Sequence, residues 1–419
     1  MARAQRTLVI GLGLATFAAS YVLGTTHATP RPPDHLVIVV LDSVRADAAG
    51  AWGQTLPTTQ SINDLAESAL VFQDAHAPTL GSTSSYTSIW GSTYPEASGV
   101  GPNAAAFCTN DTFDLLPTAF QRAGFHTEAL VNTDGMRPDL GYRRGFDDWN
   151  GTPVDRVGQK PRAIRLNYRE LKRSLKTLFA RWNPTERQLL YVHLNGASLP
   201  LEPSWEARRR MELKGESFEP LRGADVRAYN DLAAVGELDS AIQERVRLTY
   251  LASVSDADRR VRLVLDALEQ EGRREDTALV VVGNHGVMLW EDGAFGTGSS
   301  DAIGASHVPL MIRAPGVTPG VARQTFSLVD LAPTLTSLMG IEAPEMWVGH
   351  ARELTQEVAS GGAYVQYRDR HAWVDNGTTQ TWTDDRPDDL GPNAQRVLAD
   401  LTPRTAPVAN RPCKTPPAN

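Results

Sequence analysis

Hydrophobic residues follow two alternating patterns along this chain. Short runs of apolar, often β-branched residues predict buried strands at residues 36–41, 126–132, 189–194, 278–283 and 310–313. Longer segments with apolar residues at helical spacing predict helices at residues 61–68, 83–90, 115–123, 163–180, 241–271 and 328–339. Strands that alternate with helices predict an α/β fold, in which a mostly parallel central sheet carries helices on both faces.

The first 28 residues have the pattern of an export signal. Arg3 and Arg6 precede an apolar run at residues 8–23, and small or polar residues follow as far as Ala28. The run, at about 16 residues, is short for a membrane-spanning helix. Two interpretations therefore stay open, a cleaved signal peptide and an uncleaved membrane anchor. Both predict that the rest of the chain is exported, to the periplasm, the membrane surface or the extracellular space.

The remaining sequence predicts one large domain and a small one. The main domain is expected at residues 34–349, with a charged, weakly periodic surface excursion at residues 204–238. From residue 350 the chain is polar and rich in Gly, Asp, Thr and Pro, with short β-like pieces at residues 363–367 and 379–382. We expect a small α+β subdomain at residues 350–419 that ends in a loose tail from Pro403.

Composition narrows the classes of partner. The chain has 419 residues, 41% of them hydrophobic, and a formal net charge of −8, which excludes nucleic acid as the main partner because no dense basic face is present. The basic run at residues 162–181 predicts a solvated helix face. Cys108 and Cys413 could form one disulfide in an oxidising compartment, and they do not have the spacing of a metal cluster.

Polar residues end two of the predicted strands. Asp42 directly follows the strand at residues 36–41, and Asn284 and His285 directly follow the strand at residues 278–283. If these strands are parallel neighbours, the three side chains meet at one edge, where ligands collect in open α/β sheets. Their oxygen and imidazole groups suit a divalent cation such as Ca, Mg, Mn or Zn.

A cluster of hydroxyl residues opens the helix predicted at residues 83–90. It begins with Gly81 and Ser82, and a hydroxyl at such a place is most often an N-cap. The functional alternative is a nucleophile, because a hydroxyl beside free backbone N–H groups and a cation can attack an ester that these groups hold.

Several motifs of this chain, in order from about residue 34 to 349, resemble those of sulfatases and related members of the alkaline phosphatase superfamily. They are Leu41-Asp42-Ser-Val-Arg45-Ala-Asp47, Pro57-Thr-Thr, Val71-Phe-Gln-Asp-Ala-His-Ala-Pro78, Gly124-Phe-His-Thr, Arg144-Gly-Phe-Asp147, Val308-Pro-Leu-Met-Ile-Arg-Ala-Pro-Gly316 and Ser327-Leu-Val-Asp330-Leu-Ala-Pro-Thr-Leu335. The resemblance implies a three-layer sandwich with a small C-terminal subdomain.

The resemblance also assigns roles to positions of this chain. Asp42 corresponds to the first metal-binding aspartate, Ser43 to a second acidic position, and Ser82 to the residue that sulfatases convert to formylglycine. The proline and arginine of the conversion motif fall on Ser84 and Tyr86. Without them we expect no formylglycine, so that Ser82 stays a plain alcohol, as the nucleophile does in phosphatase-like relatives.

Other charged positions of the family are replaced here. An Asp-Pro-His-x-Pro turn becomes Gly196-Ala-Ser198-Leu-Pro200, Asp-His-Gly becomes Asn284-His285-Gly286, and a late basic position falls on Thr297. Tyr86, Ser198 and Thr297 therefore stand where substrate-binding groups are expected. Replacement ligands could come from His76, His126, His193, His307 or His350, of which His307 lies nearest to the same sheet edge in the predicted order.

Two functions from different classes follow from these replacements. In the first, the chain is a sulfatase-like pseudoenzyme with weak or no classical activity and a binding role at the cell envelope. In the second, it is a metal-dependent hydrolase or transferase with Ser82 as its nucleophile. Its substrate would be a sulfate or phosphate ester of a small molecule, glycan or lipid.

Overall fold

The computed structural model describes residues 31–98, 100, 114–133, 136, 138, 141–151, 166–183, 185–213, 219–291, 293–297, 302–357, 360–383, 387 and 389–401. The expected signal segment, Cys108, Cys413 and the C-terminal tail lie outside these residues. The described residues from Pro32 onward belong to one compact unit.

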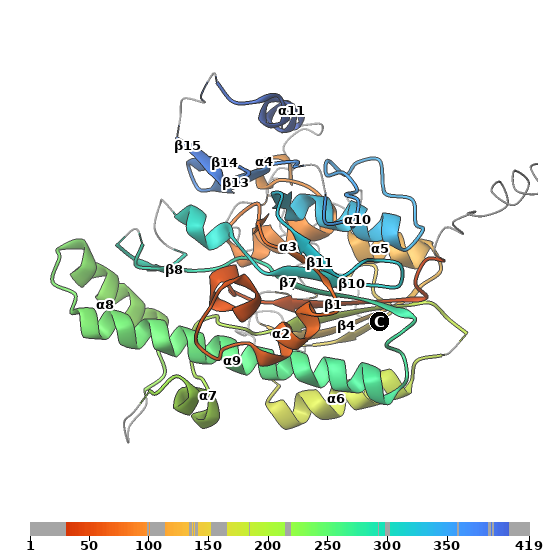
Figure 1. The fold of residues 1–419 in the computed structure, drawn as a ribbon, viewed down its shortest axis with the longest axis horizontal. Helices are drawn as coiled ribbons and strands as arrows, with labels where there is room; N and C mark the ends of the chain where they lie inside the picture. Colours follow the sequence, from red (N-terminus) through yellow and green to blue (C-terminus); the bar gives the residue numbers. More distant parts are fainter. Residues whose placement is uncertain are drawn as a thin grey trace, which may run out of the picture. The chain divides into compact units, whose positions relative to one another are not determined.

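A sheet of eight described strands forms its centre (Figure 1). In spatial order these are β11 (Gly320–Ala322), β2 (Leu70–Phe72), β10 (Leu310–Arg313), β7 (Thr277–Gly283), β1 (His35–Leu41), β6 (Gln188–Leu194), β4 (His126–Asn132) and β5 (Asp148–Asn150). β1 pairs in parallel with both β7 and β6, and β6 pairs in parallel with β4. β10 runs antiparallel to both of its neighbours. The five predicted strands and the mostly parallel sheet are confirmed.

Helices cover both faces of the sheet because β1 alternates its side chains between two cores. Val37, Val39 and Leu41 belong to the core under one helix layer, and Leu36, Ile38 and Val40 belong to the core under the other. The first layer contains α2 (Gln60–Ala66), α6 (Tyr168–Ala180) and α9 (Ser240–Gln270). The second contains α3 (Ser82–Gly91), α5 (Leu116–Arg122) and α10 (Leu331–Leu338). Figure 1 shows the two layers on opposite sides of the sheet.

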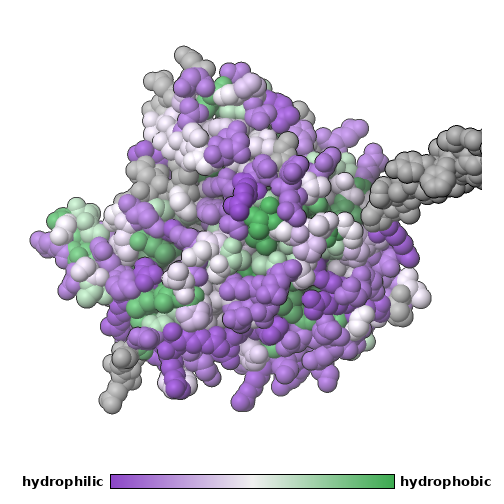
Figure 2. Space-filling model, in the orientation of Figure 1, coloured by the Kyte–Doolittle hydropathy of each residue, from purple (hydrophilic) through white to green (hydrophobic). Residues whose placement is uncertain are grey.

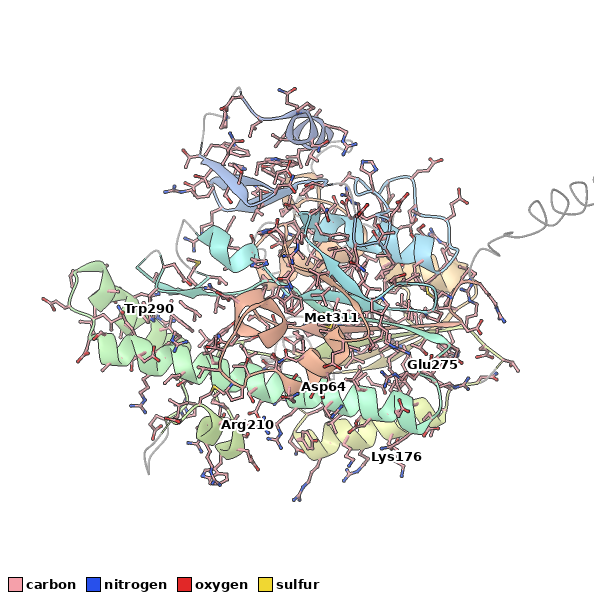
Figure 3. All side chains as sticks on the ribbon, viewed as in Figure 1. Asp64, Lys176, Arg210, Glu275, Trp290 and Met311 are labelled. Carbon is pink, nitrogen blue, oxygen red and sulfur yellow. The ribbon has the colours of Figure 1, made fainter. Side chains whose placement is uncertain are left out.

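Burial separates the inner and outer residues of this sandwich. Met311 on β10 is fully buried between the layers, whereas Lys176 on α6 points away from the sheet into solvent (Figure 3). Lys172 and Arg173 on the same helix are exposed as well. In the described part of the basic run, the prediction of a solvated helix face is therefore confirmed.

The structure differs from the sequence-based expectation in the excursion at residues 204–238, which contains two helices. α7 (Trp205–Arg210) and α8 (Gly223–Ala234) each bury one residue of their helical span, Ala207 and Val226 respectively. So narrow a buried face leaves little hydrophobic periodicity in the sequence, which is why neither helix was predicted. The start of α6 also differs, because a capping box between Asn167 and Glu170 begins the helix there.

The C-terminal region forms a small antiparallel sheet of three described strands, β13 (Ala363–Tyr367), β14 (Arg370–Asp375) and β15 (Thr378–Trp382), followed by α11 (Pro392–Asp400). The expected small C-terminal subdomain is thus present, although β14 was not predicted. Tyr364 and Trp373 of this sheet share a hydrophobic cluster with Tyr94 and Val329 of the main part.

The face of the molecule drawn in Figure 2 is mostly hydrophilic, with separate apolar patches. Two exposed apolar side chains, Leu232 and Val235, lie at the end of α8. None of the described helices has the length and apolar character that a membrane span requires.

Candidate active site

Three parallel strands end at one edge of the sheet and place polar side chains beside one another. Asp42 follows β1, Asn284 and His285 follow β7, and Thr133 follows β4 by one residue. Asp42, Asn284 and His285, which were predicted to meet, do lie together. Their exposed fractions are 3%, 0% and 2%, so water reaches none of them freely.

The side chain of Asn284 has one orientation that satisfies its neighbours. Its Oδ1 accepts the backbone N–H groups of Ser43 (2.9 Å) and His285 (2.8 Å). Because backbone N–H groups can only donate, this oxygen must face them, and the amide nitrogen must face the other way. That nitrogen, Nδ2, donates to Oδ1 of Asp42 at 2.8 Å.

Neutral donors surround the Asp42 carboxylate. Besides the Asn284 amide, Oδ2 accepts from Thr133 Oγ1 (3.1 Å) and Oδ1 accepts from Ser43 Oγ (3.3 Å). Burial by itself would raise the pKa of Asp42, but the nearby imidazoles of His193 and His285 and the hydrogen bond from the Asn284 amide outweigh it and hold the pKa well below its usual range. Asp42 is therefore an anion at neutral pH, and hydrogen bonds from neutral groups hold its carboxylate in place.

Ser82 and His285 form a hydrogen-bonded pair. Ser82 is the first residue of α3, and its Oγ lies 2.8 Å from Nε2 of His285. The other ring nitrogen, Nδ1, lies 2.8 Å from the carbonyl oxygen of Gly286, so Nδ1 carries the proton and Nε2 accepts from the serine. Burial lowers the pKa of His285 more than the charge of Asp42 raises it, which keeps the imidazole neutral at pH 7.

Tyr86 occupies space beside the same carboxylate. It is fully buried on α3, and its hydroxyl lies 3.1 Å from Nε2 of His193. His193, on β6, is also fully buried and bonds through Nδ1 to the hydroxyl of Tyr191 at 2.7 Å. Its Nε2 is 3.8 Å from Oδ2 of Asp42. Two tyrosine hydroxyls and one imidazole, joined by hydrogen bonds, thus fill the side of the site where the family resemblance places an arginine.

The other two positions expected to bind substrate differ in their placement. Ser198 lies near Asp42, since its Oγ is 3.2 Å from Oγ of Ser43. Thr297 follows β9 (Phe295–Gly296), and among the described contacts none joins its side chain to Asp42, Ser82 or His285. The structure therefore brings Ser198 to the predicted site, and it does not bring Thr297 into hydrogen bonding with it.

His307 lies in a separate cluster. Its Nε2 bonds to the carbonyl oxygen of Gln73 (2.8 Å), and its ring stacks on His76 at 5.4 Å. His76 in turn lies 2.9 Å from Ser306 Oγ and 2.9 Å from Asp74 Oδ1. Of the five histidines considered as replacement ligands, it is His193 that reaches Asp42.

Thr133 and Tyr191 were not among the predicted site residues, and His193 was only one of five histidines considered as replacement ligands. A usable signal existed for Thr133, because it follows a predicted strand just as Asp42 does. His193 and Tyr191 lie inside a predicted buried strand, and nothing in that pattern separates them from residues of the core.

Comparison with known proteins identifies the family. The sulfatase family model matches residues 34–341, which is most of the chain and includes every strand-end residue described above. The chain belongs to the sulfatase family. It is 35% identical to a choline-sulfatase of Rhizobium meliloti over 102 residues, which are 24% of this chain and 20% of that relative. It is 21% identical to human iduronate 2-sulfatase over 413 residues, covering 80% of this chain and 74% of that relative.

Solved structures show the same fold. A phosphonate monoester hydrolase from Silicibacter pomeroyi has a TM-score of 0.65 at 18% identity and covers 83% of this chain and 87% of its own. A protein solved in complex with its substrate D-glucosamine-2-N,6-O-disulfate has a TM-score of 0.64 at 15% identity, covering 84% of this chain and 91% of its own. At 15–18% identity these structures show the fold alone. The chemistry of this sulfatase-family chain must therefore be inferred from its own residues.

The donor atoms of this site do not fit the divalent metal that sulfatases commonly use. Asp42 is the single carboxylate of the group, and both of its oxygens already accept hydrogen bonds. Asn284 turns an N–H donor, and not an oxygen, toward it. Within the described residues, no group of three or more His, Cys, Asp and Glu side chains is arranged to hold a metal ion. A divalent cation requires several free oxygen or nitrogen lone pairs directed at one point.

Gly196 leaves no room for the acid that the family carries in its turn. A Cβ atom at this position would lie 2.6 Å from the carbonyl oxygen of Asp42 and 2.7 Å from Cγ2 of Val44. The backbone after β6 lies directly against the backbone after β1, where the N–H of Ala197 donates to the carbonyl oxygen of Asp42 at 2.9 Å.

Proposed function

We propose that this sulfatase-family chain keeps the family's fold around a site that binds no catalytic metal and does not hydrolyse sulfate esters, and that it acts as an exported binding protein at the cell envelope. The observation that carries the proposal is the orientation of Asn284. Its amide N–H donates to Oδ1 of Asp42, so that a donor, and not an oxygen ligand, faces the carboxylate.

Electrostatics support the same conclusion for an anionic substrate. The hydrogen bonds described above for the side chains of Asp42, Ser82 and His285 involve no lysine or arginine. Arg45, on the same loop as Asp42, is held by Asp47 (2.6 Å), Glu291 and the carbonyl oxygen of Val287 (3.1 Å). A sulfate anion about 4 Å from Asp42 would face a repulsion of about 4 kcal/mol at an effective dielectric constant of 20.

The second candidate is a metal-dependent sulfo- or phosphoester hydrolase or transferase that uses Ser82. The Ser82–His285 hydrogen bond favours a nucleophilic role for this serine. The same bond argues against a metal at His285. Nδ1 of His285 already bonds to the carbonyl oxygen of Gly286, and Nε2 accepts the hydrogen bond from Ser82.

Assays on anionic esters test this proposal. The purified full chain should show no hydrolysis of p-nitrophenyl sulfate, p-nitrophenyl phosphate or glucosamine 6-sulfate above the Ser82→Ala variant, with or without added Ca²⁺, Mg²⁺, Mn²⁺ or Zn²⁺. Mass spectrometry of the peptide that contains Ser82 should show an unmodified serine. Turnover of any of these substrates that disappears in both Ser82→Ala and Asp42→Ala would establish the second candidate instead.

A further inference from the structure

We infer that Ser82 and His285 form a metal-independent nucleophile–base pair that hydrolyses uncharged carboxylic esters through an acylated Ser82. This activity goes beyond the proposed loss of sulfate-ester hydrolysis, and it uses groups that remain after the metal site has been filled by Asn284. It needs no cofactor other than water.

The geometry has the two parts that nucleophilic catalysis by serine requires. The hydroxyl of Ser82 lies 2.8 Å from an unprotonated ring nitrogen, Nε2 of His285. The ring is in turn oriented by a hydrogen bond from Nδ1 to the Gly286 carbonyl oxygen at 2.8 Å. A nucleophile in contact with a base, and a base oriented by a third group, is the arrangement that activates serine in unrelated hydrolases.

Exposure distinguishes this pair from an ordinary buried hydrogen bond. Ser82 as a residue is half-buried, whereas His285 is 2% exposed. A second serine–histidine pair in the chain, Ser306 Oγ and His76 Nδ1 at 2.9 Å, has the serine fully buried. The two pairs thus have nearly the same bond length and differ in the burial of the serine, and we place the reaction at the less buried one.

The charges at the site select the class of substrate. The anion of Asp42 lies close to the pair, with its Oδ1 3.8 Å from Nε2 of His285. It repels sulfate and phosphate esters, but it stabilises the cation that forms when His285 takes a proton. An uncharged ester brings no charge of its own, and its developing oxyanion would lie near the first backbone N–H groups of α3, which have no partner inside the helix.

The reaction is balanced with water as the second reactant. The Ser82 oxygen forms a bond to the carbonyl carbon and its proton passes to Nε2 of His285. The carbon–oxygen bond to the alcohol then breaks, and His285 returns the proton to that alcohol, which leaves. Water attacks the acyl-serine, gives a proton to His285, and releases the carboxylic acid as the Ser82 oxygen regains its proton.

An uncharged fluorophosphonate probe and p-nitrophenyl acetate test the inference on the full chain. We expect the probe to modify Ser82, as identified by mass spectrometry, and not Ser306. We also expect the native protein to hydrolyse p-nitrophenyl acetate and the Ser82→Ala variant to lose this activity. The rate should fall about 100-fold or more in His285→Gln, because a positioned base contributes at least that factor. The Ser306→Ala control should retain the native rate.

The contrary results are equally specific. An unlabelled Ser82, or acetate hydrolysis that persists in Ser82→Ala, would overturn the inference. Because His285 is buried, a substitution there could prevent folding. A His285→Asn variant with a normal circular dichroism spectrum therefore serves as a second test of the base, and full activity of this variant would also contradict the inference. Neither result depends on the assays of sulfate esters, so the two proposals fail separately.

Discussion

The Asn284→Asp variant should make the protein dependent on a divalent cation for its stability. In the native chain, Nδ2 of Asn284 donates to Oδ1 of Asp42 at 2.8 Å. An aspartate would keep the oxygen that accepts the Ser43 and His285 N–H groups, but it would replace the donor by a second carboxylate oxygen. Two carboxylates at this distance in a buried site repel each other, or share a proton, at a cost of about 2–4 kcal/mol.

A cation bound between the two carboxylates would remove that penalty and so stabilise the variant. We expect the melting temperature of Asn284→Asp to fall well below that of the native protein in EDTA and to rise with added Ca²⁺ or Mn²⁺, because a ligand that binds only the folded state stabilises it by mass action. Differential scanning fluorimetry over a range of metal concentrations measures both effects.

Asn230→Asp is the matched control for this variant. The Asn230 side chain likewise pairs with backbone groups, the N–H and carbonyl oxygen of Phe295 at 2.9 and 3.1 Å, but no carboxylate contacts it among the described residues. It should lose some stability without any response to metal. An Asn284→Asp protein as stable as the native one in EDTA would show that the Asn284–Asp42 contact does not have the role given to it here.

Removal of the Asp258 carboxylate should lower the free energy of unfolding by about 2–4 kcal/mol, because it leaves two buried backbone N–H groups without acceptors. Asp258 lies on α9 and is 2% exposed. Its Oδ2 and Oδ1 accept the N–H groups of Ser61 (3.0 Å) and Ile62 (2.8 Å) at the start of α2. Burial raises the pKa of this carboxyl despite these bonds.

Urea denaturation of Asp258→Ala and Asp258→Asn measures the effect. The asparagine retains one acceptor oxygen, so its loss should be the smaller of the two. Asp266→Ala, on the same helix, is the control. Asp266 is about half exposed and lies 3.8 Å from Arg262, so it should change stability by less than about 0.5 kcal/mol. Equal losses for Asp258→Ala and Asp266→Ala would refute the capping role.

The sequence predicted the framework of this molecule well because the framework depends on continuous hydrophobic patterns. β1 and β7 are unbroken apolar runs that pair in parallel, as expected, and that pairing alone placed Asp42 beside Asn284 and His285. α7 and α8 were not predicted, because each buries a single residue of its helical span and leaves almost no periodic signal.

The chemistry of the site was less accessible from the sequence, because it depends on the direction of side chains. The strand-end positions indicated that Asn284 would meet Asp42. They did not indicate which end of the amide, the N–H or the oxygen, would face the carboxylate. That direction is set by the backbone N–H groups of Ser43 and His285, which only the folded loops bring together. The same holds for His193 and Tyr86, whose contact joins β6 to α3 across 107 residues of sequence.

The central claim is that this sulfatase-family site is complete without a metal ion. Elemental analysis of the native protein, purified without chelators and dialysed against Ca²⁺, Mg²⁺, Mn²⁺ or Zn²⁺, tests it most directly when combined with melting curves in EDTA. We predict no stoichiometric metal and the same melting temperature with and without EDTA. One equivalent of a bound divalent ion, lost in an Asp42→Ala variant and accompanied by a lower melting temperature in EDTA, would contradict the claim.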